Sequence, residues 1–164
     1  MSDQNMPFKC RIEKVRDEWI DYNGHFNMGY YGALFDITAD DAFETMGLGP
    51  DYVETGFSFY TLEAHISYLQ ELHAGDAVQV YFRILDHDAK RIHYFEEMYH
   101  AEGGWLAATL EGICMHVDMS AKKSCPFPDD ILKQIAAMHD AHKDLLVPPQ
   151  VGSKIGIIRK TATS

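Results

Sequence analysis

Residues 19–31 read WIDYNGHFNMGYY, a polar turn that runs directly into an apolar segment, and this stretch decides how the chain folds. Asn27 is a favoured N-cap residue, and no proline occurs from Met28 to Met46. The pattern therefore predicts a long helix that begins at Asn27 or Met28. The sequence GLGP at 47–50 ends it, because glycine favours a left-handed cap and proline cannot continue a helix.

The turn carries one carboxylate, that of Asp21, close to the expected start of the helix. The first N–H groups of a helix have no partner within it and can bind an anion. Oriented donors of this kind stabilise an oxyanion by roughly 3 kcal/mol each, and a carboxylate beside them serves as general base or nucleophile. Gly24 and Gly29 leave room for a substrate to approach the backbone. These residues indicate a site for attack on an ester or thioester carbonyl.

A simpler interpretation of the turn is equally open at this point. Residues 21–24, Asp-Tyr-Asn-Gly, form a strong turn signal by themselves, with aspartate at the first position. On that interpretation Asp21 holds the turn together and has no chemical role.

Most of the remaining chain has the alternating hydrophobic pattern of β-strands. Gly112, inside the strand expected at 105–118, suggests a bulge or a close backbone approach. The tail after about residue 148 is expected to be extended or flexible, and residues 1–164 are expected to form a single domain of the α+β class. The expected elements are a weak edge strand at 8–16, strands at 57–69, 76–85, 92–100 and 105–118, and an amphipathic helix at 129–141.

The strand at 57–69 alternates with a period of two. Thr61, Glu63 and His65 are expected on one face, where the carboxylate and the imidazole project the same way. The opposite face is expected to join the core through Tyr60, Leu62, Ala64, Ile66 and Tyr68.

The net charge indicates which kinds of partner are unfavourable, and the cysteine content indicates the expected cellular compartment. Fourteen basic and twenty-five acidic residues give a net charge of −11, which argues against nucleic acid or an anionic membrane as partner. The cysteines have no CxxC spacing, and neither an apolar leader nor a membrane-spanning run is visible, so a cytoplasmic protein is expected. An anionic ligand would need locally concentrated positive charge, for which Lys90 and Arg91 are the candidates.

A metal site is not expected. His139 and His142 have an i, i+3 spacing that could ligate a metal ion, but no cysteine or third histidine accompanies them in the sequence. The pair is better explained as ordinary helix residues.

One strand, one long buried helix and four antiparallel strands is an order that resembles the hotdog fold, in which a sheet wraps around a central helix. Asp21-x-x-Gly24-His25, followed directly by the helix, resembles the motif of acyl-CoA thioesterases of the 4-hydroxybenzoyl-CoA thioesterase type. The likeness covers about residues 8–140 and also includes Glu63 and the Gly-Asp pair at 75–76.

Within that superfamily, WIDYNGH at 19–25 and TLEAHI at 61–66 look most similar to the betainyl-CoA thioesterase group, which is linked to carnitine breakdown. Phe26 departs from that group, in which a smaller residue or methionine is expected. This departure concerns the shape of the acyl pocket.

The resemblance implies catalytic roles for named residues. Asp21 takes the place of the catalytic carboxylate, and the Met28 N–H takes that of the oxyanion donor. His25 and Asn27 would shape or polarise the thioester site, and Glu63 would come from a neighbouring subunit, since these folds pair as dimers. The substrate-binding residues implied are Gly24 and Thr61, with Lys90 and Arg91 as the candidates for the phosphates of coenzyme A. The resemblance also makes an aromatic cluster a candidate cage for a trimethylammonium group, its members being Trp19, Tyr22, Tyr30, Tyr31, Phe59 and Tyr60.

The sequence therefore predicts an acyl-CoA thioesterase that hydrolyses a small acyl-CoA, betainyl-CoA being the particular candidate, to the free acid and coenzyme A. No cofactor is expected beyond the coenzyme A of the substrate, and the protein is expected to be a homodimer or homotetramer. Two alternatives stay open. One is a hotdog enoyl-CoA hydratase or dehydratase with Asp21 and His25 as its acid–base pair, and the other is a non-catalytic acyl-CoA-binding module.

Overall fold

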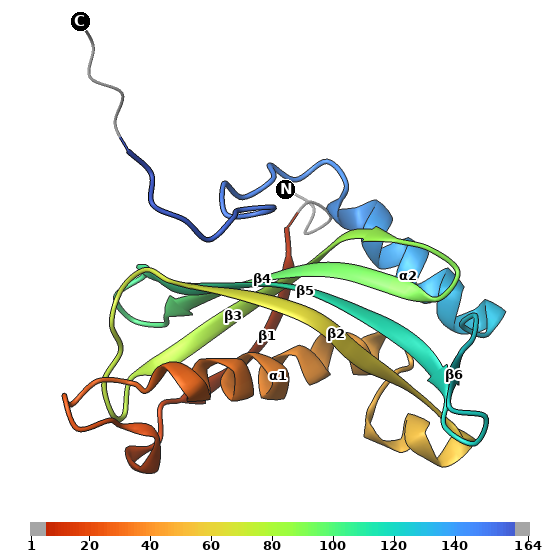
Figure 1. The fold of residues 1–164 in the computed structure, drawn as a ribbon, viewed down its shortest axis with the longest axis horizontal. Coiled ribbons are helices and arrows are strands. Elements are labelled where there is room, and N and C mark those ends of the chain that lie inside the picture. The colour runs from red at the N-terminus through yellow and green to blue at the C-terminus, as the bar shows by residue number, and fades with distance from the viewer. Residues whose placement is uncertain (1–5, 160–164) are drawn as a thin grey trace, which may run out of the picture.

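A computed structural model of the chain describes residues 6–159. Its main element is an antiparallel sheet with the strand order β1-β3-β4-β5-β2, to which the short β6 adds by pairing with β5. Helix α1 lies below the sheet in Figure 1, and helix α2 lies above it. The elements are β1 Phe8–Lys14, η2 Asp17–Trp19, α1 Met28–Thr45, η3 Pro50–Thr55, β2 Phe57–Tyr68, β3 Ala77–His87, β4 Arg91–His100, β5 Leu106–Asp118, β6 Lys123–Ser124 and α2 Asp129–His142.

The order and type of the long elements agree with the sequence-based prediction. The 3-10 helices η2 and η3 and the two-residue strand β6 were not predicted, because such short pieces have no periodicity to detect. Within residues 6–159, no helix combines the length and the apolar composition needed to cross a membrane.

Helix α1 begins where the turn residues predict. The Asn27 side chain accepts a hydrogen bond from the Gly29 N–H at 2.9 Å, which is the expected N-cap contact. Leu34, Phe35 and Ala42 are fully buried against the sheet. The first turn differs, because the Met28 side chain is 68% exposed. The helix is therefore anchored along its length and open at its N-terminus.

Strand β2 does not keep the single alternation that its sequence suggests. Its pairing with β5 shifts between Thr61 and Glu63, which leaves Leu62 as the extra residue of a β-bulge. The core-facing side chains are therefore Phe59 before the bulge and Ile66 after it. The expectation that Thr61 and Glu63 share one face was wrong, since a bulge reverses the alternation.

Gly112 marks a close approach between neighbouring strands, one of the two possibilities indicated by the sequence. It pairs with Tyr94 on β4, and a Cβ at Gly112 would lie 2.5 Å from Cζ of that tyrosine. Only glycine leaves room for the Tyr94 ring to lie across β5. The ring is 6% exposed and stacks 5.4 Å from Phe82.

Helix α2 covers the part of β3 that β1 does not reach. The register of β1 on β3 ends at Phe82, and beyond it the Ile84 N–H donates to Nδ1 of His142 at 3.1 Å. Burial lowers the pKa of His142 to about 4, and the positive charge of Arg83 acts in the same direction. His142 is thus a neutral imidazole that accepts a backbone hydrogen bond.

When the pH is lowered from 7 to 5, we expect the free energy of unfolding to fall less in the His142→Gln variant than in the native chain. An unfolded histidine binds a proton below about pH 6.5, whereas folded His142 resists protonation until about pH 4. Stability from this residue is therefore lost as the pH falls below that of the unfolded imidazole. Urea unfolding at both pH values measures the difference, and parallel losses in the two proteins would contradict it.

The chain after α2 crosses the sheet on the side opposite α1 (Figure 1). Arg83 donates to the Leu146 carbonyl at 3.0 Å, and the Gly152 N–H donates to Glu111 at 2.7 Å. No strand forms within residues 143–159. Residues 143–159 form turns and irregular chain that is held to the sheet at two points. Its isoleucines, including Ile158 at 97% exposure, remain in solvent.

Candidate active site

Asp21 lies in a tight turn that it stabilises itself. Its Oδ1 accepts the Asn23 N–H at 2.8 Å and the His25 N–H at 3.2 Å, and its own N–H donates to the His25 carbonyl at 2.9 Å. Gly24 has φ of +81°, a left-handed conformation that favours glycine. Oδ2 of Asp21 has no hydrogen-bond donor within residues 6–159. One oxygen therefore holds the turn and the other is available for chemistry.

The start of α1 offers the donor that the sequence analysis requires. Of the first N–H groups, that of Gly29 bonds the Asn27 side chain and that of Tyr30 bonds the Asn27 carbonyl at 3.0 Å. The Met28 N–H has no acceptor among the described residues. The Tyr68 hydroxyl donates to the Met28 carbonyl at 3.0 Å and so fixes this first turn to β2. A free, oriented donor lies at the helix mouth.

The His25 side chain pairs with Glu71 and forms no ion pair with the Asp21 carboxylate among the described residues. Its Nε2 lies 3.0 Å from Oε2 of Glu71, and its ring meets that of His73 edge-on at 5.6 Å between centroids. Glu71 and His73 come from the loop between β2 and β3 and were not predicted as site residues. No signal in the sequence brings this loop to the turn, because the contact depends on tertiary structure.

The aromatic residues of the predicted cage do not meet around one space. Trp19 is 7% exposed and stacks with Phe26 and with Tyr30, at 5.9 and 5.8 Å between ring centroids. Tyr31 is 4% exposed and packs 4.2 Å from Phe26. Tyr22 is 98% exposed. Within one chain, these rings are core and surface residues rather than a cage.

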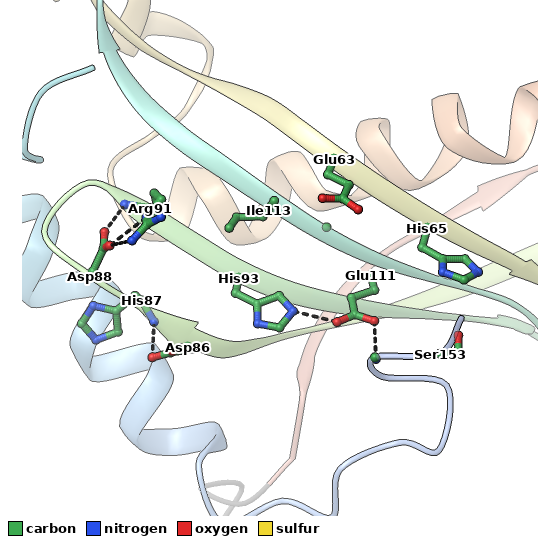
Figure 2. Close-up of a pocket in the computed structure, with 12 residues that line it drawn as sticks. Glu63, His65, Asp86, His87, Asp88, Arg91, His93, Glu111, Ile113 and Ser153 are labelled. Carbon is green, nitrogen blue, oxygen red and sulfur yellow. Dashed lines mark hydrogen bonds and ion pairs between the residues drawn. The ribbon is translucent and has the colours of Figure 1, made fainter. Parts of the chain in front are cut away.

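Glu63 lies in a different region from Asp21. It lines a pocket of about 470 Å³ together with His65, and in Figure 2 helix α1 lies behind the sheet that carries them. In this pocket Glu111 accepts from His93 at 2.8 Å and from the tail N–H of Gly152 at 2.7 Å. The pocket is on the outer face of the sheet, whereas the helix mouth is at the inner face. One chain therefore does not bring Glu63 to the Asp21 turn.

Lys90 and Arg91 lie at the end of β3 remote from Asp21. The strand has 11 residues, so roughly 35 Å separate its two ends. The Arg91 guanidinium binds Asp88 at 2.5 Å, and this pairing lowers the pKa of Asp88 to about 2. Lys90 donates to Ser124 at 3.2 Å. Within one chain these cations therefore belong to the hairpin.

The structure adds a buried carboxyl group that the sequence analysis missed. Glu96 is 2% exposed on the central strand β4, and its Oε2 has no hydrogen-bond partner among the described residues. Burial, and secondarily the charge of Asp36, raises the pKa of Glu96 well above its usual value. The alternation of β4, in which Ile92 and Met98 are also buried, was the available signal.

An antiparallel sheet wrapped around one long helix, with a carboxylate in the turn that leads into the helix and a free N–H at its first residue, defines the class of hotdog-fold hydrolases. The comparisons with known proteins agree with this class. Residues 15–135 match the thioesterase-like superfamily, and the chain belongs to that family. This confirms the family predicted from the Asp21 motif, and the fold predicted with it.

Three relatives illustrate the likeness. The "L-carnitine dehydrogenase/betainyl-CoA thioesterase" of Rhizobium meliloti is 36% identical over 94% of this chain, which spans only 31% of that relative's length. The "Betainyl-CoA thioesterase" of Pseudomonas aeruginosa is 35% identical, covering 87% of this chain and 91% of the relative. A Staphylococcus aureus structure solved in complex with CoA has a TM-score of 0.87 and 30% identity, covering 96% of this chain and 99% of that one.

Proposed function

We propose that the protein hydrolyses a small acyl-CoA thioester, with the reaction at the mouth of α1. The observations that support this most are an Asp21 carboxylate oxygen with no donor and a Met28 N–H with no acceptor among the described residues, on the turn that leads into α1. A thioester carbonyl bound there meets both the group that starts the reaction and the donor that stabilises its oxyanion. Membership of the thioesterase-like superfamily supports the same reaction.

The chemistry has two routes from the same geometry. In one, Asp21 removes a proton from water, the water oxygen bonds to the carbonyl carbon, and the C–S bond breaks to release CoA as the thiol. In the other, the Asp21 carboxylate attacks the carbonyl carbon and the C–S bond breaks to release CoA. Water then hydrolyses the acyl–Asp21 anhydride to the free acid and the Asp21 carboxylate. In both, negative charge develops on the carbonyl oxygen at the Met28 N–H.

We further propose betainyl-CoA as the substrate to test first, because relatives at 36% and 35% identity carry betainyl-CoA thioesterase in their names. Thioester hydrolysis releases free thiol from a saturated acyl-CoA. A hydratase would instead need an enoyl or 3-hydroxyacyl substrate, and a binding module would bind acyl-CoA without turnover. These three outcomes separate the proposal from its alternatives.

Strand β2 supports a dimer as the working form. It is the edge of the sheet, so one side of its 12-residue backbone has no partner strand among the described residues. Tyr60 and Leu62 are 53% and 52% exposed on it. A long apolar edge strand invites a second strand, and two identical edges related by a two-fold axis pair antiparallel. We propose that two copies join through β2.

Such a dimer would complete the site. Antiparallel pairing sets the Tyr68 end of β2, next to Met28, beside the Phe57 end of the partner strand. Arg91 belongs to that second end, because it pairs with Met115, which in turn pairs with Tyr60. In this dimer, Arg91 of one chain would lie near Asp21 of the other chain, although the two residues are far apart within one chain. This supports the predicted role of the basic hairpin toward coenzyme A.

We expect Leu62→Glu to convert the dimer to a monomer and to abolish most of the turnover. Near the proposed two-fold axis, the new carboxylates would face each other next to both copies of Glu63, and opposed like charges destabilise paired strands. Light scattering and thiol release measure the two effects. Ile157→Glu, at an 80% exposed tail position, is the matched control and should change neither. A dimeric Leu62→Glu protein would refute the interface.

A further inference from the structure

Three side chains of metal-ligand type gather beside the Asp21 turn. His25, Glu71 and His73 each place one ligand atom within 4.8 Å of the others. The closest pair is His25 Nε2 and Glu71 Oε2 at 3.0 Å. We propose that these three residues form a binding site for a zinc-class divalent metal ion. The sequence analysis considered only His139 with His142 and did not predict this set.

The backbone holds the three positions together. The Phe26 N–H donates to the Leu72 carbonyl at 2.8 Å and so joins the turn directly to the loop before β3. Phe26 and Leu72 are buried, at 4% and 0% exposure. Because these two side chains point into the core, their neighbours in sequence extend outward from the same place. The site is thus a consequence of core packing, so the ligand positions do not depend on a mobile loop.

A carboxylate also accepts a hydrogen bond from the backbone N–H of each histidine. The His25 N–H donates to Asp21 at 3.2 Å, and the His73 N–H donates to Oδ2 of Asp76 at 2.8 Å. The same Oδ2 lies 3.8 Å from Nδ1 of the His73 ring. In zinc sites, the imidazole nitrogen that does not bind the metal commonly donates to a carboxylate. We assign that role to Asp76, which would leave Nε2 of His73 for the metal.

The donor set selects the kind of ion. Two imidazoles and one carboxylate are the protein ligands of three-ligand zinc sites that keep one position for water, whereas calcium and magnesium prefer oxygen ligands alone. Zinc bonds of about 2 Å bring ligand atoms to roughly 3.3 Å from each other. The side chains of His25 and Glu71 are 46% and 58% exposed and that of His73 is 52% exposed, so small rotations can close the set.

This site does not depend on the proposed hydrolysis. Two of the three residues, Glu71 and His73, have no part in the proposed reaction. Binding of the ion can therefore be measured without any substrate. A protein that proves inactive on every thioester would still test the metal site.

The test is a titration of the metal-stripped full chain with Co²⁺, followed by displacement with Zn²⁺. We expect one Co²⁺ per chain, a visible absorption typical of four or five ligands, and displacement by one equivalent of Zn²⁺. His73→Gln and Glu71→Gln should each weaken binding at least tenfold, since each removes one of three ligands. Circular dichroism checks that these exposed positions leave the fold unchanged.

His65→Gln is the matched control, because His65 belongs to the histidine-rich pocket on the outer face of the sheet. It should leave Co²⁺ affinity and stoichiometry unchanged. The proposal is overturned if no stoichiometric binding occurs, if His73→Gln and Glu71→Gln bind as well as the native chain, or if His65→Gln loses the ion instead.

Discussion

Asp21→Asn should lower the rate of thioester hydrolysis by about 10³-fold while leaving the fold intact. Loss of a general base costs about 10² to 10⁴ in rate, and loss of a nucleophile removes the covalent route altogether. The amide oxygen of asparagine can still accept the Asn23 and His25 N–H groups that Oδ1 accepts in the native turn. The substitution therefore separates the chemical role of Asp21 from its structural one.

Thiol release and thermal unfolding, measured on the same preparation, test this prediction. Glu18→Gln, an exposed carboxylate three residues earlier, is the matched control and should retain native turnover. An Asp21→Asn protein that unfolds near the native temperature and hydrolyses at the native rate would leave only the turn-forming role. If Asp21→Asn is inactive, a single turnover of the native chain in ¹⁸O-labelled water distinguishes the routes, since only the nucleophilic route can incorporate label into Asp21.

Glu96→Gln should become more stable than the native chain as the pH rises from 5 to 7. Burial raises the pKa of Glu96 well above its usual value, so the folded protein retains a proton there. In the unfolded chain a glutamate loses its proton above about pH 4.3. Stability is therefore lost with rising pH, by up to about 1.4 kcal/mol for each pH unit, until the folded pKa is passed. Glutamine is neutral throughout and does not contribute this loss.

Urea unfolding of both proteins at pH 5, 6 and 7 measures the effect. The difference between the two free energies of unfolding should grow steadily in favour of Glu96→Gln. Asp144→Asn, an exposed acid after α2, is the control and should follow the native chain. A constant difference across the three pH values would mean that Glu96 has the same pKa folded and unfolded.

Much of the fold could be predicted because its signals are local. Asn27 caps α1 through its own side chain, and the stretch up to Met46 contains no proline. The strands were equally predictable from their two-residue alternation of apolar and polar residues. The faces of β2 were not, because the bulge at Leu62 depends on how the strand pairs with β5. A single extra residue reversed the expected positions of Thr61 and Glu63 relative to each other.

The candidate site was only partly readable for the same reason. Asp21, Gly24, His25 and Met28 are neighbours in sequence, so the turn was found. Glu71 meets His25 only because the loop before β3 folds back on the turn. The expected contributions of Glu63 and Arg91 need a second chain, which the sequence of one chain does not position. The local turn and helix start were predictable, and the assembly of distant segments was not.

The central claim is that the helix mouth at Asp21 hydrolyses a thioester. The most direct measurement is thiol release from betainyl-CoA and from short-chain, medium-chain and aromatic acyl-CoA, with the native chain and Asp21→Asn side by side. We expect steady turnover of at least one saturated acyl-CoA by the native chain, highest with betainyl-CoA, and its loss in the variant. Absence of thiol release across the panel, with acyl-CoA still raising the unfolding temperature, would contradict the claim and favour a binding module or a hydratase.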